Sequence, residues 1–515
     1  SDSFVVESLV EAMILVAAHG KRLPRPERIL RYRAGGEVRL NAMNDALQPH
    51  AGGLIEHWSE SVHGEIRDDQ GIGVRNPDTG DFMHYYLAGA YDSNIALVIA
   101  HGKGRRQNLE ALADILRRME LRGNELKTNR EFHYGIINFC LGLHPMLKPD
   151  TGFVVPYLAA VGSLAHEMSI FDRETAWNEI QRKITEQYGP DGAETVHSKL
   201  TLLSRPVDMM MANAHAAMGW LVRYHRRAFI IENGQVKWQR NPLRVLAEMY
   251  HFLHLEDRDN AAPVQQIWPD DLTLLNRGLQ FYEDLEKNLG IDTEKDYLLS
   301  HSTTGENTSH LYEKLNSALL SEQNPFQGQQ PFNRMDDRTY RACQAAHRGW
   351  QSGMTMLDLF ILMGERAGVL DFEVDDTLAP RIPDRFRDKE NQADYLKALA
   401  PPPVASADTI VAVSGGMFYS RETPDSEPYV DVGGHFDVGQ PLYIIEVMKM
   451  FNKVYAEFSG TLEEILIDGD ASKVVKKGQP LFLVKPDEEI IIETEEEKAA
   501  RRKKATLELM RSVAV

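Results

Sequence analysis

Lys449 is the residue whose setting in this sequence most clearly indicates chemistry. It lies between Met448 and Met450, at the junction of two similar segments. The segment before it reads Gly-Gln-Pro-Leu-Tyr (439–443), and the segment after it reads Gly-Gln-Pro-Leu-Phe (478–482). Such a repeat predicts two related half-sheets, with the lysine in the turn where they join. A primary amine on such a turn is accessible to a modifying enzyme, whereas a surface lysine elsewhere is usually just a solvated charge.

A lysine on a rigid turn can hold a cofactor at the end of its long side chain. Biotin and lipoamide are group carriers of this kind. The two halves around Lys449 differ in length, because 24 positions separate Gly415 from Gly439 but only 18 separate Gly460 from Gly478. The extra residues are expected in 421–428, whose Pro, Asp and Ser content is typical of a surface loop.

Three segments near the lysine resemble the biotin carboxyl carrier domain of acetyl-CoA carboxylases: Met417-Phe418-Tyr419, Thr423-Pro424-Asp425 and 446–450. The resemblance covers Thr409 to Pro486 and implies an all-β flattened barrel with the thumb loop of the bacterial carriers. It also implies that a biotin protein ligase attaches biotin covalently to Lys449, between Met448 and Met450. Val447 replaces the usual alanine. Lipoyl domains share the fold but lack the paired methionines, so biotin is favoured.

Arg39 is the second candidate functional residue. Four segments resemble the C-terminal subdomain of biotin carboxylase in order and spacing: 17–24, 36–42, 91–96 and 127–129. In that family the arginine at the position of Arg39 lies beside bicarbonate and biotin, and a planar guanidinium suits such anions. The alternative is that Arg39 only pairs with a carboxylate on a strand edge. Two positions depart from the family, since Met43-Asn44 replaces an acidic pair and Leu97 replaces a lysine.

The nucleotide-binding part of a biotin carboxylase is not found in this sequence. Neither a glycine-rich phosphate loop nor a Glu-x-Asn-x-Arg metal motif precedes the resembling segments. The resemblance therefore implies an ATP-grasp partner subunit, which uses ATP, magnesium and bicarbonate, and a carboxyltransferase partner that receives the carboxyl group. The chain alone is not expected to activate bicarbonate, and no metal-binding residues are predicted in it.

Composition limits the partners and the compartment. The 515 residues suggest several domains, and the net charge of −19 argues against nucleic acid or anionic membrane as a partner. Two distant cysteines, Cys140 and Cys343, do not form a disulfide framework and fit a reducing cytoplasmic setting. No apolar run reaches transmembrane length, and the first residues do not resemble a signal peptide. A cytoplasmic protein without a membrane association is expected.

Hydrophobic periodicity predicts a multidomain α+β protein. The expected parts are an α+β subdomain over 1–150, a mostly helical scaffold over 151–400, a Pro/Ala linker over 401–408, the carrier domain over 409–486 and a charged tail over 487–515. In the scaffold, single helices are expected over Pro206–His225 and Arg338–Met363, and a hairpin over 228–238. The methionines at 209–211 and 218 are expected to fill the core. The tail is expected to be a charged helix, a disordered end or a docking helix.

These patterns favour a biotin-carrying subunit of a multi-subunit acyl-CoA carboxylase, with acetyl-CoA as the expected acceptor, in a higher-order hetero-oligomer. One alternative is a non-catalytic scaffold and carrier whose carboxylase-like region is degenerate. Another is a fragment of a longer single-chain carboxylase. The carboxyltransferase, rather than this chain, is expected to select the acceptor.

Overall fold

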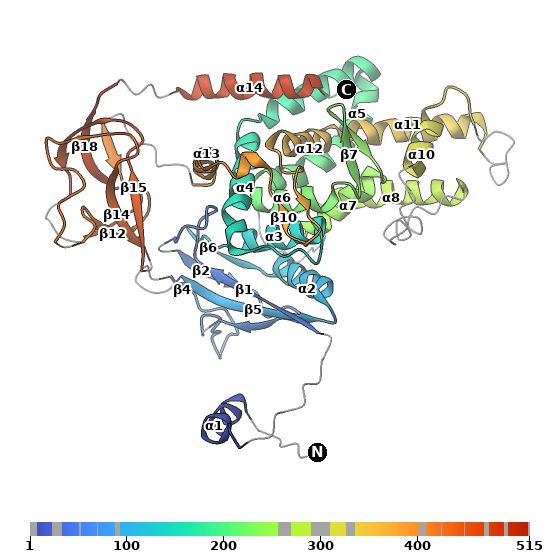
Figure 1. Ribbon diagram of the computed structural model, residues 1–515. Coiled ribbons are helices and arrows are strands. Elements are labelled where there is room, and N and C mark those ends of the chain that lie inside the picture. The colour runs from blue at the N-terminus through green and yellow to red at the C-terminus, as the bar shows by residue number, and fades with distance from the viewer. Residues whose placement is uncertain are drawn as a thin grey trace.

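The chain contains, in order, an N-terminal region of strands and helices, a mostly helical central region and a C-terminal region of strands followed by one helix (Figure 1). The computed structural model describes residues 8–22, 33–50, 53–69, 71–87, 93–255, 269–289, 310–325, 335–400, 408–423, 425–447, 449–467, 473–488 and 493–512. Most of the predicted linker, residues 401–407, and Met448 lie outside this set. Among the described residues no single helix is long and apolar enough to span a membrane, although the bent pair Thr151–Ser169 and Arg173–Asp191 meets the length and composition criteria together.

The N-terminal region (residues 33–143) contains two antiparallel three-stranded sheets, ordered β1-β5-β3 and β4-β2-β6. Its elements, with the preceding helix α1 (Leu9–His19), are β1 (Ala34–Asn41), β2 (Leu54–Trp58), β3 (Ile66–Asp68), β4 (Tyr85–Tyr86), β5 (Asn94–Gly102), α2 (Arg105–Arg118), β6 (Leu121–Asn124) and α3 (Arg130–Leu143). On β1, Val38 and Leu40 are buried, whereas Arg39 between them is exposed. Since strand side chains alternate between faces, the face that bears Arg39 is the open one.

The central region is mostly helical. Its elements are α4 (Val154–Ser169), α5 (Arg173–Met211), α6 (Ala214–Tyr224), β7 (Phe229–Glu232), β8 (Gln235–Trp238), α7 (Pro242–Phe252), α8 (Pro269–Leu289), α10 (His310–Leu320), α11 (Asp337–Gly353), α12 (Thr355–Ala367), β9 (Glu373–Val374), β10 (Pro380–Arg381) and α13 (Lys389–Leu399), with short 3-10 turns at Thr151–Phe153 and Asp384–Phe386. The predicted hairpin over 228–238 is confirmed, since β7 pairs with β8 through a turn in which Asn233 and Gly234 have φ of 54° and 73°.

Both predicted long helices of this region are wrong, because each is divided in two. Over 206–225, α5 ends at Met211, and Asn213 begins α6 by accepting a hydrogen bond from the Ala216 N–H at 3.0 Å. Over 338–363, α11 ends at Gly353, and the Thr355 hydroxyl donates to the carbonyl of Ser352 at 3.1 Å. Apolar periodicity continues through both breaks, so the pattern alone could not locate them.

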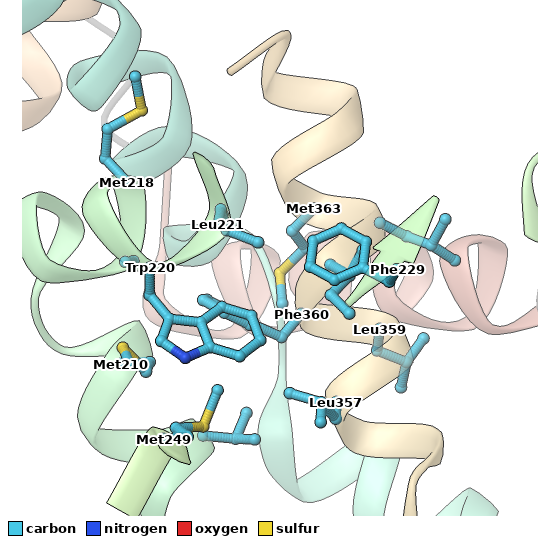
Figure 2. Packing of buried hydrophobic residues seen from close by; sticks show 14 of the residues in the cluster. Met210, Met218, Trp220, Leu221, Phe229, Met249, Leu357, Leu359, Phe360 and Met363 are labelled. Carbon is cyan, nitrogen blue, oxygen red and sulfur yellow. The ribbon is translucent and has the colours of Figure 1, made fainter. Parts of the chain in front are cut away.

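Large apolar side chains from separate helices pack together in the central core (Figure 2). Trp220 of α6 stacks on Phe229 of β7 with ring centroids 6.1 Å apart, and Phe360 of α12 lies 5.8 Å from the same indole. Met210 and Met218 are fully buried in this cluster. The prediction that these methionines fill the core is therefore confirmed.

The C-terminal sheet domain (residues 408–488) consists of two four-stranded antiparallel sheets, ordered β11-β18-β16-β13 and β15-β14-β12-β17. The strands are β11 (Thr409–Val411), β12 (Gly416–Tyr419), β13 (His435–Phe436), β14 (Pro441–Val447), β15 (Met450–Tyr455), β16 (Gly460–Ile465), β17 (Lys473–Val475) and β18 (Pro480–Pro486). Strands β11 to β14 form the first half of the domain, and strands β15 to β18 form the second half. If each strand is replaced by the strand at the same position in the other half (β11 by β15, β12 by β16 and so on), one sheet order becomes the other. The two halves predicted from the sequence repeat are therefore related by an approximate twofold axis.

The repeated Gly-Gln-Pro-Leu segments have matching conformations. The Gly439 N–H donates to the carbonyl of Ala456 at 2.8 Å, and the Gly478 N–H donates to the carbonyl of Ala412 at 2.8 Å. Both glycines adopt left-handed φ, 81° and 78°, which costs glycine little. The repeat thus encodes the same turn twice, once in each half.

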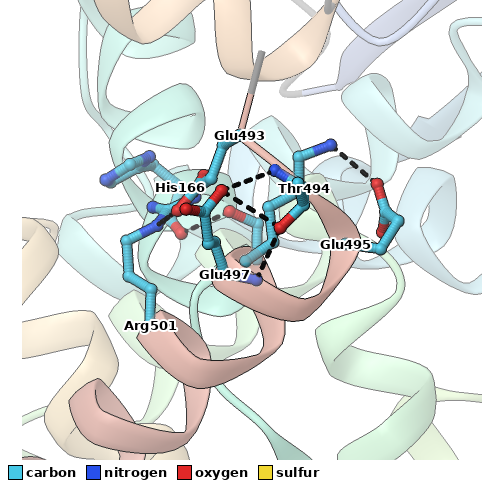
Figure 3. Close-up of polar contacts among 8 residues, drawn as sticks. His166, Glu493, Thr494, Glu495, Glu497 and Arg501 are labelled. Atoms are coloured by element: carbon cyan, nitrogen blue, oxygen red, sulfur yellow. Dashed lines mark hydrogen bonds and ion pairs between the residues drawn. The ribbon is translucent and has the colours of Figure 1, made fainter. Parts of the chain in front are cut away.

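Helix α14 (Glu495–Ser512) follows the C-terminal sheet domain and packs on α5. Its first turn is closed by a capping box, in which Thr494 and Glu497 exchange hydrogen bonds, and Arg501 pairs with Glu493 at 2.8 Å (Figure 3). Further along, the hydroxyl of Thr506 accepts a hydrogen bond from the Asp172 N–H at 2.7 Å. Of the three expectations for the tail, the structure shows a docked helix.

We expect Gly416→Ala to destabilise the C-terminal sheet domain. A Cβ at position 416 would lie 2.5 Å from the Glu446 carbonyl oxygen, so β12 and β14 would have to separate. Such overpacking typically costs about 1–3 kcal/mol. Gly415→Ala is the matched control, since a Cβ there would meet its nearest atom at 3.5 Å. Equal melting temperatures for the two variants in calorimetry would contradict this account.

Candidate functional site

The turn between β14 and β15 presents Lys449 to solvent. Val447 pairs with Met450 across the hairpin, which leaves positions 448 and 449 as its tip. Lys449 adopts a left-handed φ of 65°, a conformation that costs most residues about 1–2 kcal/mol. Its side chain is exposed, and within the described part of the chain it makes no hydrogen bond or ion pair. The amine is therefore free to react.

The base of this hairpin is rigid because β14 is buried along its length. Tyr443, Ile445 and Val447 are almost completely inaccessible, and the Tyr443 hydroxyl donates to the carbonyl of Val411 at 3.1 Å. These contacts hold the strand that leads into the turn. The lysine side chain is the flexible part of an otherwise fixed structure.

One row of side chains crosses the outer face of the sheet directly below the turn. Strand register aligns Phe451, Glu446, Met417 and Val474 from β15 to β17. The carboxylate of Glu446 accepts a hydrogen bond from the Tyr419 hydroxyl, which raises the pKa of Tyr419 to about 12. Phe451 and Val474 are 62% and 77% exposed, so this row presents apolar surface next to the lysine.

The loop between β12 and β13 covers the next row of the same face. Lys453 pairs with Glu422 at 2.7 Å, and its amine lies 6.0 Å from the centre of the Tyr429 ring. Residues 421–428, predicted to be the inserted loop, fall inside this connection, and Pro424 lies outside the described residues. Phe451 lies outside this ion pair and is 62% exposed.

Arg39 lies on an exposed face of β1, and its backbone is held from the side. The guanidinium Nε donates to the Asn94 side-chain oxygen at 3.2 Å. Asn129 donates to the carbonyl of Arg39 at 3.1 Å and accepts from the Asn41 N–H at 2.8 Å. His133 donates to the same Arg39 carbonyl at 3.0 Å. The Asn129 side chain thus bonds backbone groups of Arg39 and Asn41 that a neighbouring strand would otherwise pair.

Sequence analysis did not predict the roles of Asn129 and His133. Asn129 belonged to a recognised segment, 127–129, but no pattern indicated that its amide would bond to β1 about ninety residues earlier. The side chain of Asn129 is buried, and burial lowers the pKa of His133 to about 4. His133 is therefore neutral at physiological pH and can donate from one ring nitrogen only.

Strand register places Lys449 and the turn 476–478 at the same end of the C-terminal sheet domain. Gly416 pairs with Val475 on one side and lies against Val447 on the other. Each of these valines directly precedes one of the two turns. This end, formed by Val447, Lys449, Met450 and residues 475–478, is named the lysine end. By the approximate twofold axis, the two chain ends of the domain lie at the opposite end.

The lysine end faces the part of the N-terminal region that holds Arg39. The pKa of His50 is lowered mainly by burial and further by the positive charges of Lys477 and Lys127. Lys127 is two residues before Asn129, which clamps β1 at Arg39. The buried apolar residues of the two regions also form one contiguous cluster. Figure 1 shows the same arrangement, with the C-terminal sheet domain beyond the β4 end of the N-terminal region.

The candidate residues Arg39 and Lys449 thus lie in parts of the fold that face each other. Met450 is half exposed beside the lysine, and Met448 lies outside the described residues. Among the residues that the structure describes, no group of three or more His, Cys, Asp or Glu side chains is placed to bind a metal ion. The chemistry available at the site is that of a free amine and an exposed guanidinium.

Comparison with known proteins identifies a domain of the biotin-requiring enzyme family over residues 412–484. The chain is similar to the biotin carboxyl carrier protein of acetyl-CoA carboxylase from Pseudomonas aeruginosa, with 42% identity over 13% of this chain and 43% of that protein. The carrier protein from Streptococcus pyogenes is 38% identical over 16% of this chain and 48% of its own length, and chloroplastic carrier protein 1 from Arabidopsis thaliana is 33% identical over 19% and 42%. The chain spans less than half the length of these curated relatives.

The biotin carboxylase domain of 2-oxoglutarate carboxylase from Hydrogenobacter thermophilus is a solved structure that is similar to part of the chain. Sequence identity is 20%, the TM-score is 0.18, and the match covers 25% of this chain and 26% of the other. This similarity is too low to assign a fold. The C-terminal sheet domain therefore has biotin carboxyl carrier relatives. For the N-terminal region, any functional argument has to come from the positions of its residues in this structure.

Acidification is expected to destabilise the protein partly through His133. Between pH 6.5 and pH 4 the unfolded chain binds a proton at this residue and the folded chain does not, so the free energy of unfolding falls as the pH falls. His133→Gln can still donate to the Arg39 carbonyl but cannot titrate. Its loss of stability from pH 6.5 to 4.5 should be smaller by about 2 kcal/mol in denaturant titrations. The exposed-site control His101→Gln should lose as much as the wild type, and a His133→Gln profile parallel to wild type would contradict the assignment.

Proposed function

We propose that this chain is the biotin-carrying component of a biotin-dependent acyl-CoA carboxylase of the acetyl-CoA type, with biotin attached to Lys449. The single observation that carries the proposal is the free amine of Lys449 at the tip of a hairpin in a domain of the biotin-requiring family. Bound biotin would accept and release a carboxyl group. The chain's own contribution is to present, move and position that group.

The residues around Lys449 fit biotin attached through an amide bond. The amine has no competing partner among the described residues, and the turn projects it from a buried strand. A biotin protein ligase could therefore reach it without local unfolding. The half-exposed Met450 and the exposed Phe451 supply apolar surface beside the point of attachment. The Lys449 side chain is exposed, so its reach is that of a swinging arm.

Arg39 is proposed to take part in the carboxylation half of the reaction. Its guanidinium is permanently charged and lies on an open strand face at the end of the N-terminal region that faces the lysine end. The clamp formed by Asn129 and His133 fixes the backbone on which the side chain turns. Such a group can hold bicarbonate and stabilise developing negative charge beside it.

The remaining parts of the reaction are assigned to an ATP-grasp biotin carboxylase, which uses ATP, magnesium and bicarbonate, and to a carboxyltransferase. These parts can belong to partner subunits of a cytoplasmic hetero-oligomer or to other segments of a longer polypeptide. The second candidate function is a non-catalytic scaffold and carrier. The packing of α14 on the helices of the central region favours this second function, because that contact holds the chain together without any carboxylase activity.

Lys449 is expected to be the biotinylated residue. Expression with a biotin protein ligase should give one biotin adduct in intact-mass analysis, because one amine projects from the family's attachment hairpin. Lys449→Arg should abolish the adduct. Lys453→Arg, four residues along the same hairpin and already paired with Glu422, is the matched control and should retain it. A lipoyl mass, or an adduct that survives Lys449→Arg, would refute the assignment.

Arg39 is expected to be required for carboxylation but not for assembly. Removing one charged donor from a reaction site typically lowers the rate about 10²–10³-fold. Both Arg39→Ala and Arg39→Lys should show large losses, since an ammonium cannot reproduce the bidentate fork. The measurement is ATP-dependent incorporation of radiolabelled bicarbonate by the complex isolated with the chain from its native cells.

The control for Arg39 is Arg106→Lys, which changes an exposed arginine on α2 of the same region. It should leave incorporation unchanged. Biotinylation of Lys449 and recovery of the partners should be the same in all variants, because neither depends on Arg39. Equal incorporation by wild type and both Arg39 variants would favour the scaffold and carrier function instead.

A further inference from the structure

A cavity of about 540 Å³ lies where the N-terminal region meets the central region. On the N-terminal side its wall consists of Asp45, β6 and the segment from β6 to the first turn of α3. On the central side the wall consists of the end of α4, the junction of α5 and α6, and the end of α13. Figure 1 shows β6, α4 and α13 close together at this point. The volume is in the range of small-molecule sites, and the proposed carrier reaction assigns no role to it.

The charged side chains on the wall leave hydrogen-bond donors without a partner. Glu131 pairs with Arg130 at 2.6 Å, so these two charges compensate each other. Arg122 pairs with Glu120 at 2.6 Å through Nη2, but its buried Nε has no acceptor in the described part of the chain. Lys127 is exposed and forms no ion pair with any described residue. The Arg122 Nε and the Lys127 amine are therefore available to an anion in the cavity.

The first turn of α3 supplies further donors on the same wall. The first N–H groups of a helix have no acceptor inside that helix and carry partial positive charge, so they attract anions. The residue before the first turn, Asn129, makes no capping hydrogen bond, because its side chain is bound to β1 instead. The end of α3 that lines the cavity is thus left without the cap that Asn129 would otherwise give.

His215 adds a buried acceptor at the start of α6. The residue is only 2% exposed and lines the cavity. Its Nε2 donates to the carbonyl of Asp45 at 2.8 Å, which leaves Nδ1 as an acceptor, and Nδ1 has no partner among the described residues. Burial lowers the pKa of His215, so the ring is neutral and keeps this acceptor at physiological pH. A buried acceptor without a donor is uncommon in folded proteins, and here it lies beside a cavity.

We propose that this cavity binds a small oxyanion that also carries a hydroxyl group, such as the phosphate monoester of a polyol or a hydroxycarboxylate. The oxyanion accepts hydrogen bonds from Lys127, Arg122 and the first turn of α3. The hydroxyl group donates to His215 or to the neighbouring Asp45 carboxylate. Both the unpaired donors and the unpaired acceptor of the wall are then satisfied by one molecule.

The position of the cavity connects an occupant to two parts of the proposed reaction. Thr128 and Arg130 on its wall flank Asn129, whose side chain bonds the backbone of Arg39. Leu399, also on the wall, ends α13, the last helix before the C-terminal sheet domain. An occupant therefore stabilises the clamp on β1 and the base from which the carrier domain extends. Only this consequence relies on the proposed function, whereas the binding itself does not.

Calorimetric titration of the full chain at low ionic strength tests the proposal with two pairs of probes. Glycerol 3-phosphate is compared with propyl phosphate, and malate is compared with succinate, so that the members of each pair differ in their hydroxyl groups. In at least one pair the hydroxylated probe should bind at least about fivefold more tightly than its counterpart, because it alone supplies a donor to the buried acceptor. The pair that binds identifies whether the site holds a phosphate or a carboxylate group.

Two variants of the wall test where the oxyanion lies. Lys127→Ala should weaken binding of the preferred probe about fivefold, and Thr128→Asp should weaken it about tenfold or more, because it places a carboxylate where the oxyanion binds. Thr128→Asp should not lower the melting temperature, since an acidic residue is favourable at a helix N-terminus. Lys103→Ala removes an exposed lysine of the same region that is not on the wall, and as the matched control it should leave binding unchanged.

The proposal would be overturned by the absence of binding heat with all four probes or by equal affinities within both pairs. Undiminished binding by both wall variants would overturn it as well. Biotinylation of Lys449 should be the same in every variant, because none of them alters the C-terminal sheet domain. Failure of binding on a biotinylated chain would therefore reject the oxyanion site and leave the proposed function intact.

Discussion

The rest of the site depends on the fixed turn that carries Lys449. Buried residues on β14 and the close approach of Gly416 to Glu446 hold the strand that enters the turn. The lysine backbone is kept in a left-handed conformation that an isolated peptide would seldom adopt. The cost of this conformation is met by the two packed sheets. A mobile side chain on an immobile base is what a group carrier requires, because the arm can move without loosening the domain.

The approximate twofold axis also determines which end of the C-terminal sheet domain is connected to the rest of the chain. It places the ends of the domain opposite Lys449, and the chain on both sides leads to helices on the central region, α13 on α4 and α14 on α5. The domain is thus attached at its far end, and its lysine end is directed towards the N-terminal region.

Features encoded locally could be predicted from the sequence. The Gly-Gln-Pro-Leu repeat indicated the two halves and the turn at Lys449, and Glu232–Gly234 indicated the β7–β8 hairpin. Features created by distant contacts could not. Helix breaks at Asn213 and Met354 interrupt continuous apolar periodicity, and the clamp from Asn129 to β1 joins segments far apart in the chain. The exposed row of Phe451 and Val474 also required the register of four strands, since the two residues are not close in sequence.

The exposed apolar side chains bear on the choice between the two functions considered. A chain that only held a carrier domain in place would gain nothing from Phe451 and Val474 in water beside the lysine, since exposed apolar edges promote aggregation. Nor would such a scaffold need a guanidinium on an open sheet face with its backbone fixed by Asn129 and His133. Both features are accounted for if Lys449 and Arg39 take part in one reaction, as proposed, because a carrier lysine and an anion-binding guanidinium must both remain accessible.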